Sequence, residues 1–110
     1  MEITTRDYKR ANVIRVVGRV DAGTYSELEA KLNEYIANGH VHLVLEMDAT
    51  EYLSSAGARV LISAQKALKP NGGAVYLSQP SVRVKEVLEM AGLDPLFRVF
   101  PDTEAALGSL

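Results

Sequence analysis

Residues 51–58 read EYLSSAGA, and at this point an apolar strand passes into a helix. Two hydroxyls, those of Ser54 and Ser55, fall at the helix start, where backbone N–H groups lack helical partners and the helix dipole is positive. Serine is a preferred N-cap residue, because its oxygen accepts a hydrogen bond from an N–H two or three residues on. A phosphate on either serine would also be tolerated there. The segment therefore predicts a helix start, and a capping serine can at the same time be a phosphate acceptor.

The residues after the two serines predict which faces of this helix are used. Ala56, Gly57 and Ala58 leave the first turn almost without side chains, which would let a partner's backbone come close. The apolar stripe expected to face the sheet consists of Val60, Leu61, Ala64, Ala67 and Leu68. The outward face is then expected to present Ala58, Arg59, Ile62 and Lys66.

The rest of the chain alternates between patterns typical of strands and of helices. Inner strands are expected at residues 13–17, 41–47 and 74–77, and a last strand at 96–100. A more polar strand at 2–8 is expected to pair with 13–17 as an edge hairpin. A helix with an apolar face at Tyr25, Leu28, Leu32, Tyr35 and Ile36 is expected to start at a capping box of Thr24 and Glu27. Two more helices are expected, one opening at Pro80 or Ser81 with Val84, Val87, Leu88 and Ala91 inward, and a short one capped by Asp102.

These elements predict an α/β fold, with a mostly parallel mixed sheet of about five strands, a strand at its N-terminal edge and about four helices. At 110 residues the chain is expected to form a single domain over 1–110.

Composition excludes several classes of function. There is no cysteine, so no disulfide framework can form, which fits a reducing compartment. The net charge is −2 and the 12 Lys and Arg are scattered, which gives nucleic-acid binding little electrostatic support. No apolar run is long enough for a membrane span, and charges interrupt the N-terminus where a signal peptide would need an apolar core. We therefore expect a cytoplasmic location.

No catalytic, metal or cofactor site is expected. His40 and His42 lie two residues apart, but no cysteine or acidic cluster accompanies them. A hydrolase with Ser55 as nucleophile would need a base, and the Gly-x-Ser-x-Gly motif is absent. A binding protein is therefore favoured over an enzyme.

Four motifs, in their order and spacing, carry a family resemblance over nearly the whole chain. They are GRVD (18–21), EMDATEYLSSAG (46–57), GG (72–73) and MAGL (90–93). Together they resemble the STAS domain of anti-sigma factor antagonists. The resemblance implies a protein that binds a cognate anti-sigma factor, itself a serine kinase, when unphosphorylated, and so releases a sigma factor. It further implies that this kinase switches the protein off by phosphorylation and that a phosphoserine phosphatase reverses the change.

Carried over position by position, the resemblance places the phosphoacceptor on Ser55, with Ser54 as the alternative. The commonest family motif reads Asp-Ser-Ser-Gly, so Ser54 stands where aspartate is usual and Ala56 where the second serine is usual. This departure leaves open a second function, that of a docking subunit of a larger signalling or lipid-transport assembly that is never phosphorylated. Asp21 matches a family acidic residue near the acceptor, and as a residue type it is equally expected in a turn or cap. The partner surface implied by the resemblance and the outward face comprises Asp21, Ser54, Ser55, Ala56, Gly57, Ala58, Arg59 and Ile62.

Overall fold

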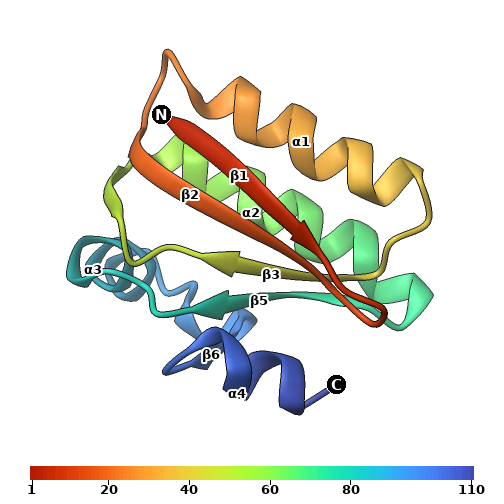
Figure 1. Ribbon diagram of the computed structural model, residues 1–110. Helices are drawn as coiled ribbons and strands as arrows, with labels where there is room; N and C mark the ends of the chain where they lie inside the picture. Colours follow the sequence, from red (N-terminus) through yellow and green to blue (C-terminus); the bar gives the residue numbers. More distant parts are fainter.

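The computed structural model describes residues 1–110 as a mixed sheet with helices on both of its faces (Figure 1). The strands are β1 (Glu2–Asp7), β2 (Asn12–Val20), β3 (His42–Glu46), β4 (Thr50–Leu53), β5 (Ala74–Ser78) and β6 (Arg98–Phe100). The helices are α1 (Tyr25–Ala37), α2 (Ser55–Leu68), α3 (Val82–Met90) and α4 (Thr103–Gly108), with short 3-10 turns η1 (Lys69–Asn71) and η2 (Asp94–Leu96). None of these helices is long and apolar enough to cross a membrane.

The order of the strands confirms the predicted α/β class. The main path through the sheet runs β1-β2-β3-β5-β6; β1 pairs antiparallel with β2, and the other neighbours pair in parallel. The N-terminal strand is thus the predicted edge strand. Its hairpin is closed by the Tyr8 N–H, which donates to the Ala11 carbonyl at 2.9 Å.

A sixth strand, β4, was absent from the expected set and is the one that carries the chain to α2. It pairs in parallel with the far end of β2, off the main path of the sheet. The register shifts between Gly18 and Arg19, where Gly18 adopts φ +98°. The prediction that this strand covers only residues 13–17 is therefore wrong, because Gly18 allows a bulge through which the strand continues to Val20.

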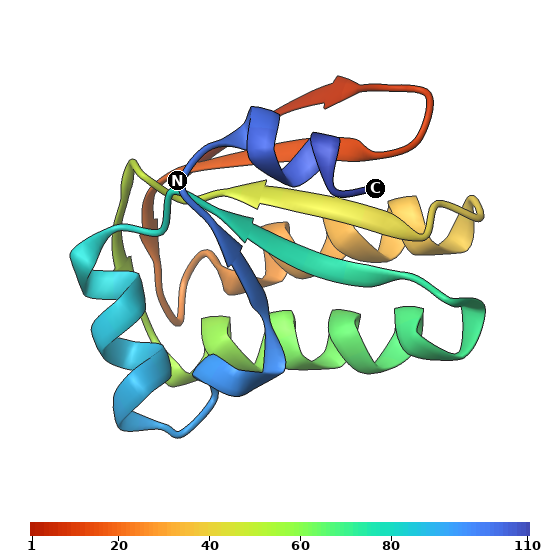
Figure 2. The ribbon, with the colours of Figure 1, turned by 90° about the horizontal axis from the view of Figure 1, so that it is seen from below.

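Alternating side chains divide the core between the two faces of the sheet. On one face Ile14, Leu45 and Leu77 belong to a cluster of 20 buried residues that includes the inward sides of α1, α2 and α3. Their neighbours point the other way, and Val13 and Val44 pack with Ala106 of α4 in a second cluster of five. Figure 2 shows the same layers, with α4 on one side of the sheet and α1 and α2 on the other.

The start of α1 corrects one expectation about a cap. Leu28, Leu32 and Tyr35 are buried as predicted. Thr24 is the N-cap residue, but its side chain caps no helical N–H. Its Oγ1 instead accepts from the Asp21 N–H at 2.9 Å and donates to the Arg19 carbonyl at 2.8 Å. The predicted capping box with Glu27 does not form, because the turn before the helix takes up the threonine hydroxyl.

The inward stripe of α2 is confirmed except at one position. Val60, Leu61, Ala64 and Leu68 are buried, but Ala67 is exposed. The buried residue in this part of the helix is Gln65, whose amide donates to the Leu96 carbonyl at 2.7 Å and accepts from the Val75 N–H at 2.6 Å. A glutamine can be buried here because two backbone groups satisfy it.

The C-terminal elements differ in detail from the expectation. In α3, Val84 and Leu88 are buried as predicted, whereas Ala91 lies after the helix end and is exposed. The last strand begins at Arg98 rather than at residue 96, because η2 occupies the preceding residues. Asp102 caps α4 as predicted, since its carboxylate accepts from the Ala105 N–H at 2.7 Å.

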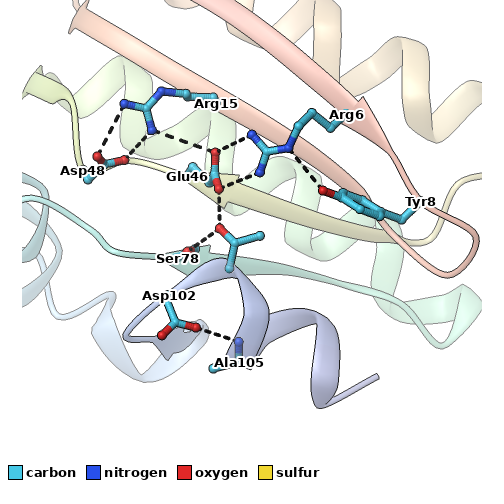
Figure 3. A network of polar contacts seen from close by, with 9 residues as sticks. Arg6, Tyr8, Arg15, Glu46, Asp48, Ser78, Asp102 and Ala105 are labelled. Carbon is cyan, nitrogen blue, oxygen red and sulfur yellow. Dashed lines mark hydrogen bonds and ion pairs between the residues drawn. The ribbon is translucent and has the colours of Figure 1, made fainter.

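A buried carboxylate joins the sheet to α4 (Figure 3). The Glu46 side chain is 8% exposed and accepts from both terminal nitrogens of Arg6, at 3.2 and 2.9 Å. Thr103, the first residue of α4, donates to the same carboxylate and contacts the Ser78 hydroxyl at 2.9 Å. Burial acts to raise the Glu46 pKa, but the hydrogen bonds from Arg6 and Thr103 outweigh it and hold that pKa below its usual value.

Candidate functional site

Ser54 is the N-cap of α2, as its residue type predicts. Its backbone is extended, and its hydroxyl accepts from the Gly57 N–H at 3.1 Å. Its own N–H donates to the Val20 carbonyl at 2.8 Å, which continues the pairing of β4 with β2. Ser54 is partly buried; its hydroxyl and its carbonyl accept from N–H groups of the helix start, and its N–H belongs to the strand pairing.

Ser55 is the first residue of α2 and is exposed. No side chain or backbone group forms a hydrogen bond with its hydroxyl, which is therefore free for chemistry. Arg59, one helical turn on and also exposed, donates from Nε to the Ser55 carbonyl at 3.4 Å. A cationic side chain thus contacts the backbone of the residue that carries the free hydroxyl, near the positive end of the helix dipole.

The small residues of the first turn face inward rather than outward. Gly57 is buried, and a Cβ at this position would lie 2.7 Å from both Leu53 Cδ1 and Val20 Cγ1. Ala58 is 4% exposed and belongs to the main core, so the expectation that it lies on the outward face is wrong. Their small size lets α2 approach the ends of β2 and β4, and Ala56, partly buried, is the small residue of this turn that remains on the surface.

Asp21 reaches the same end of the sheet as the serines. Val20 pairs with Leu53, so Asp21 and Ser54 are the residues that directly follow two paired strand positions. The Asp21 carboxylate accepts from the Gly23 N–H at 3.0 Å and the Thr24 hydroxyl at 3.1 Å. These bonds, with the nearby Arg19, hold the pKa of Asp21 below its usual value. The residue thus has the turn-forming role that its type suggests, in a place next to the serines.

A groove of about 560 Å³ runs from the two serines between α2 and α3. Its polar lining consists of Ser54, Ser55, Arg59 and Arg83. Its apolar lining includes Tyr52, Ile62, Val87, Met90 and Leu93. Ile62, expected on the outward face, is partly buried and also packs against the main core.

The groove and its α3 side were not predicted from the sequence. Arg83 and Met90 lie about 30 residues beyond the serines and reach the site because α3 packs beside β4. The one local signal was Met90, a large apolar side chain off the inward stripe of its helix, which is 89% exposed.

The site holds no group of three or more histidine, cysteine or acidic side chains that could bind a metal ion, and neither does the rest of the chain. Of the two histidines, His42 contacts the Tyr76 hydroxyl through Nδ1 at 3.1 Å and His40 packs against the Tyr35 ring.

The comparisons with known proteins identify the family. The family model described as the STAS domain matches residues 2–106. The chain belongs to the STAS domain family. BtrV of Bordetella bronchiseptica is 34% identical over 89 residues, which cover 81% of this chain and 77% of that protein. The anti-sigma-F factor antagonist RsfB of Mycobacterium tuberculosis is 27% identical over 105 residues, covering 96% and 85%.

Solved structures agree on the STAS fold. The unphosphorylated form of the anti-sigma factor antagonist SpoIIAA superposes with a TM-score of 0.82 at 22% identity, covering 96% of this chain and 93% of that one. An anti-sigma factor antagonist from Mycobacterium paratuberculosis gives a TM-score of 0.89 at 23% identity, covering 98% and 92%. The family named from the four motifs, STAS-domain anti-sigma factor antagonists, is therefore confirmed.

Proposed function

We propose that this STAS protein is an anti-sigma factor antagonist switched by phosphorylation of Ser55. Unphosphorylated, it binds a cognate anti-sigma factor that is also a serine kinase, and a sigma factor is released. Phosphorylation by that kinase ends the binding, and a phosphoserine phosphatase restores it. The observation that carries the proposal is the free, exposed hydroxyl of Ser55 at the start of α2.

The geometry favours Ser55 over Ser54 as the acceptor. Ser54 is partly buried and its oxygen accepts from the Gly57 N–H, so turning its hydroxyl outward to a kinase would break this N-cap bond, at a cost of about 0.5–2 kcal/mol. Ser55 has no such bond to lose. Its phosphate would lie beside Arg59 and the helix dipole, a contact worth about 0.3–1 kcal/mol.

The negative charge of the phosphate explains how phosphorylation would end binding to the anti-sigma factor. A phosphoserine carries a charge of about −1.5 to −2 at neutral pH. Enclosed in an interface where the anti-sigma factor supplies no opposite charge, this phosphate costs about 3–5 kcal/mol, which exceeds the gain of about 0.3–1 kcal/mol from the exposed Arg59 and the dipole. We therefore expect release of the anti-sigma factor, with Asp21, Ser54, Ala56 and Arg59 around the acceptor in the contact surface and Gly57 and Ala58 shaping it from below.

A kinase assay tests the acceptor. Each anti-sigma factor kinase of the source organism is incubated with ATP and the wild-type, Ser55→Ala or Ser54→Ala protein, and the phosphorylated residue is located by mass spectrometry. Ser55→Ala should abolish incorporation and Ser54→Ala should leave it. Phosphate found on Ser54 would show that Ser54, and not Ser55, is the acceptor. Binding of a kinase without phosphate incorporation into any of the three proteins would instead favour the function of an unphosphorylated docking subunit.

Ile62→Glu tests whether the surface extends along α2. Ile62 lies in the groove next to the serines, so a carboxylate there should weaken anti-sigma factor binding about tenfold or more. Because Ile62 also packs on the core, the variant's unfolding must be measured in parallel. Lys66→Glu, an exposed change one turn further along the helix, is the control for added negative charge. A folded Ile62→Glu protein with unchanged binding would remove Ile62 from the interface.

A further inference from the structure

The groove between α2 and α3 has the composition of a binding site for a small amphipathic anion. Eight of its 12 lining residues are hydrophobic, and its volume of about 560 Å³ lies in the range of small-molecule sites. Its two charged lining residues, Arg59 and Arg83, are both cationic and exposed, although the whole chain has a net charge of −2. Neither arginine forms an ion pair with a carboxylate of the protein, whereas Arg6, Arg15 and Arg19 each do.

We propose that this groove binds a free single-chain fatty acid. The carboxylate would bind the guanidinium groups of Arg59 and Arg83, and the alkyl chain would lie along Ile62, Val87, Met90 and Leu93. Arginine suits a carboxylate because two parallel N–H groups match its two oxygens. The exposed Met90 side chain would be covered, and its flexible thioether can adapt to a bound chain.

Two other ligand classes fit the groove less well. A nucleotide would use an aromatic face for its base, and the one aromatic ring of the lining, Tyr52, already has the Arg19 guanidinium over it, 4.4 Å from its centroid. A phosphate group would use the free N–H groups of the helix start. There the Gly57 N–H already donates to the hydroxyl of Ser54, and a phosphate group alone would leave the apolar lining of the groove uncovered. The apolar lining of the groove and its two arginines instead match the alkyl chain and the carboxylate of a fatty acid.

The position of the groove gives such a ligand a regulatory consequence that rests on the proposed function. Ser55 lines the groove together with the two arginines. A bound fatty acid would therefore compete with the anti-sigma factor for this surface, and negative charge at Ser55 would repel the carboxylate.

Titration calorimetry with sodium decanoate below its micelle concentration tests the binding. We expect saturable 1:1 binding that strengthens about two- to fourfold per methylene from octanoate to dodecanoate. The Arg59→Gln/Arg83→Gln double variant should bind decanoate about three- to tenfold more weakly, and Met90→Glu and Ser55→Glu should also bind it more weakly. Arg98→Gln, at an exposed residue that does not line the groove, should match the wild type.

Several results would overturn the proposal. These are no saturable binding by the wild type, equal affinity for decanoate and uncharged decanol, or equal affinity of the wild type and the Met90→Glu variant. Binding to anionic phospholipid vesicles without binding of free decanoate would instead indicate a membrane surface, and would also overturn it. Anti-sigma factor binding measured without fatty acid is a separate experiment, so failure of one proposal can be told from failure of the other.

Discussion

Gly57 illustrates how packing in the core can determine the residue type at a position close to the candidate acceptor. Its sequence context suggested a bare surface for a partner, but the position is buried against Val20 and Leu53. The glycine therefore determines how closely the start of α2 approaches the strand ends, and through that distance where Ser55 is presented.

Gly57→Ala should destabilise the protein although alanine is the better helix former. The helix propensity favours alanine by about 1 kcal/mol, but the new Cβ would lie 2.7 Å from two buried side chains, and such overpacking costs about 1–3 kcal/mol. The difference between these two effects gives an expected net loss of up to about 2 kcal/mol in urea unfolding. Gly108→Ala is the matched control, because nothing lies within 4 Å of a Cβ there, and it should be neutral or slightly stabilising. Equal effects at the two glycines would contradict the packing of α2.

Leu61 and Arg59 test the two faces of α2. Leu61 is fully buried, so Leu61→Ala should lower the free energy of unfolding by about 2–5 kcal/mol. Arg59 is exposed and its one hydrogen bond is long, so Arg59→Ala should change it by less than about 0.5 kcal/mol. Denaturant melts measure both, and the reverse ranking would show that the helix is rotated from the orientation described here.

At the scale of single residues, the sequence predicts well those features that depend on residues nearby in the chain. The Ser54 and Asp102 caps follow from residue type and position, and both form. The predicted capping box at Thr24 does not form, because the Thr24 hydroxyl accepts a hydrogen bond from the Asp21 N–H, three residues earlier in the chain. Ala58 and Ala67 are small enough for either face of α2, so their sequence positions did not determine their burial.

Between elements, Glu46 is the clearest example of a long-range contact that periodicity does not predict. It ends a strand in which the three preceding residues, Leu43, Val44 and Leu45, are apolar. Its carboxylate binds Arg6 from the edge strand and Thr103 from the last helix. Arg15 and Asp48 extend the network with a 2.7 Å ion pair at its exposed side (Figure 3). The network thus ties α4 to the face of the sheet opposite α2.

Glu46→Gln should destabilise the protein in a pH-dependent manner. The neutral amide loses the charge-assisted bonds with Arg6, which is itself 48% exposed, so we expect a loss of about 1–3 kcal/mol at pH 7. The pKa of Glu46 is held below its ordinary value of 4.5, so its contribution is present above that pH and is lost as the pH falls through the lower folded-state pKa. The difference between wild type and variant should therefore shrink in urea melts as the pH is lowered below 4.5. The exposed Glu89→Gln change is the control, and a difference that grows on acidification would contradict the assignment.

The short strand β4 and the groove were not predicted for a related reason. β4 has four residues, one of them exposed, and it is a strand because a bulge at Gly18 brings β2 beside it. The groove needs α3 to lie against β4, which is a contact between segments about 30 residues apart. Patterns along the chain predict the type of an element better than the neighbour it will have.

Over the whole molecule, the proposed switch acts on a site that the fold already holds in place. β2, β4, α2 and α3 meet at the two serines, and the hydroxyl of Ser55 takes no part in holding them together. A charge there should change what the surface binds while the fold stays as it is. Ser55→Glu should therefore unfold within about 0.5 kcal/mol of the wild type in urea melts, because an acidic side chain in the first turn is compatible with the helix dipole.

The most direct test of the account is titration calorimetry of the cognate anti-sigma factor with the wild-type, Ser55→Ala and Ser55→Glu proteins. We predict that Ser55→Ala binds about as tightly as the wild type, since a methyl group fits where a free hydroxyl stood. Ser55→Glu should bind at least about a hundredfold more weakly, which corresponds to about 2.7 kcal/mol. A folded Ser55→Glu protein that binds the anti-sigma factor with unchanged affinity would contradict the claim that Ser55 lies in the partner surface and controls it.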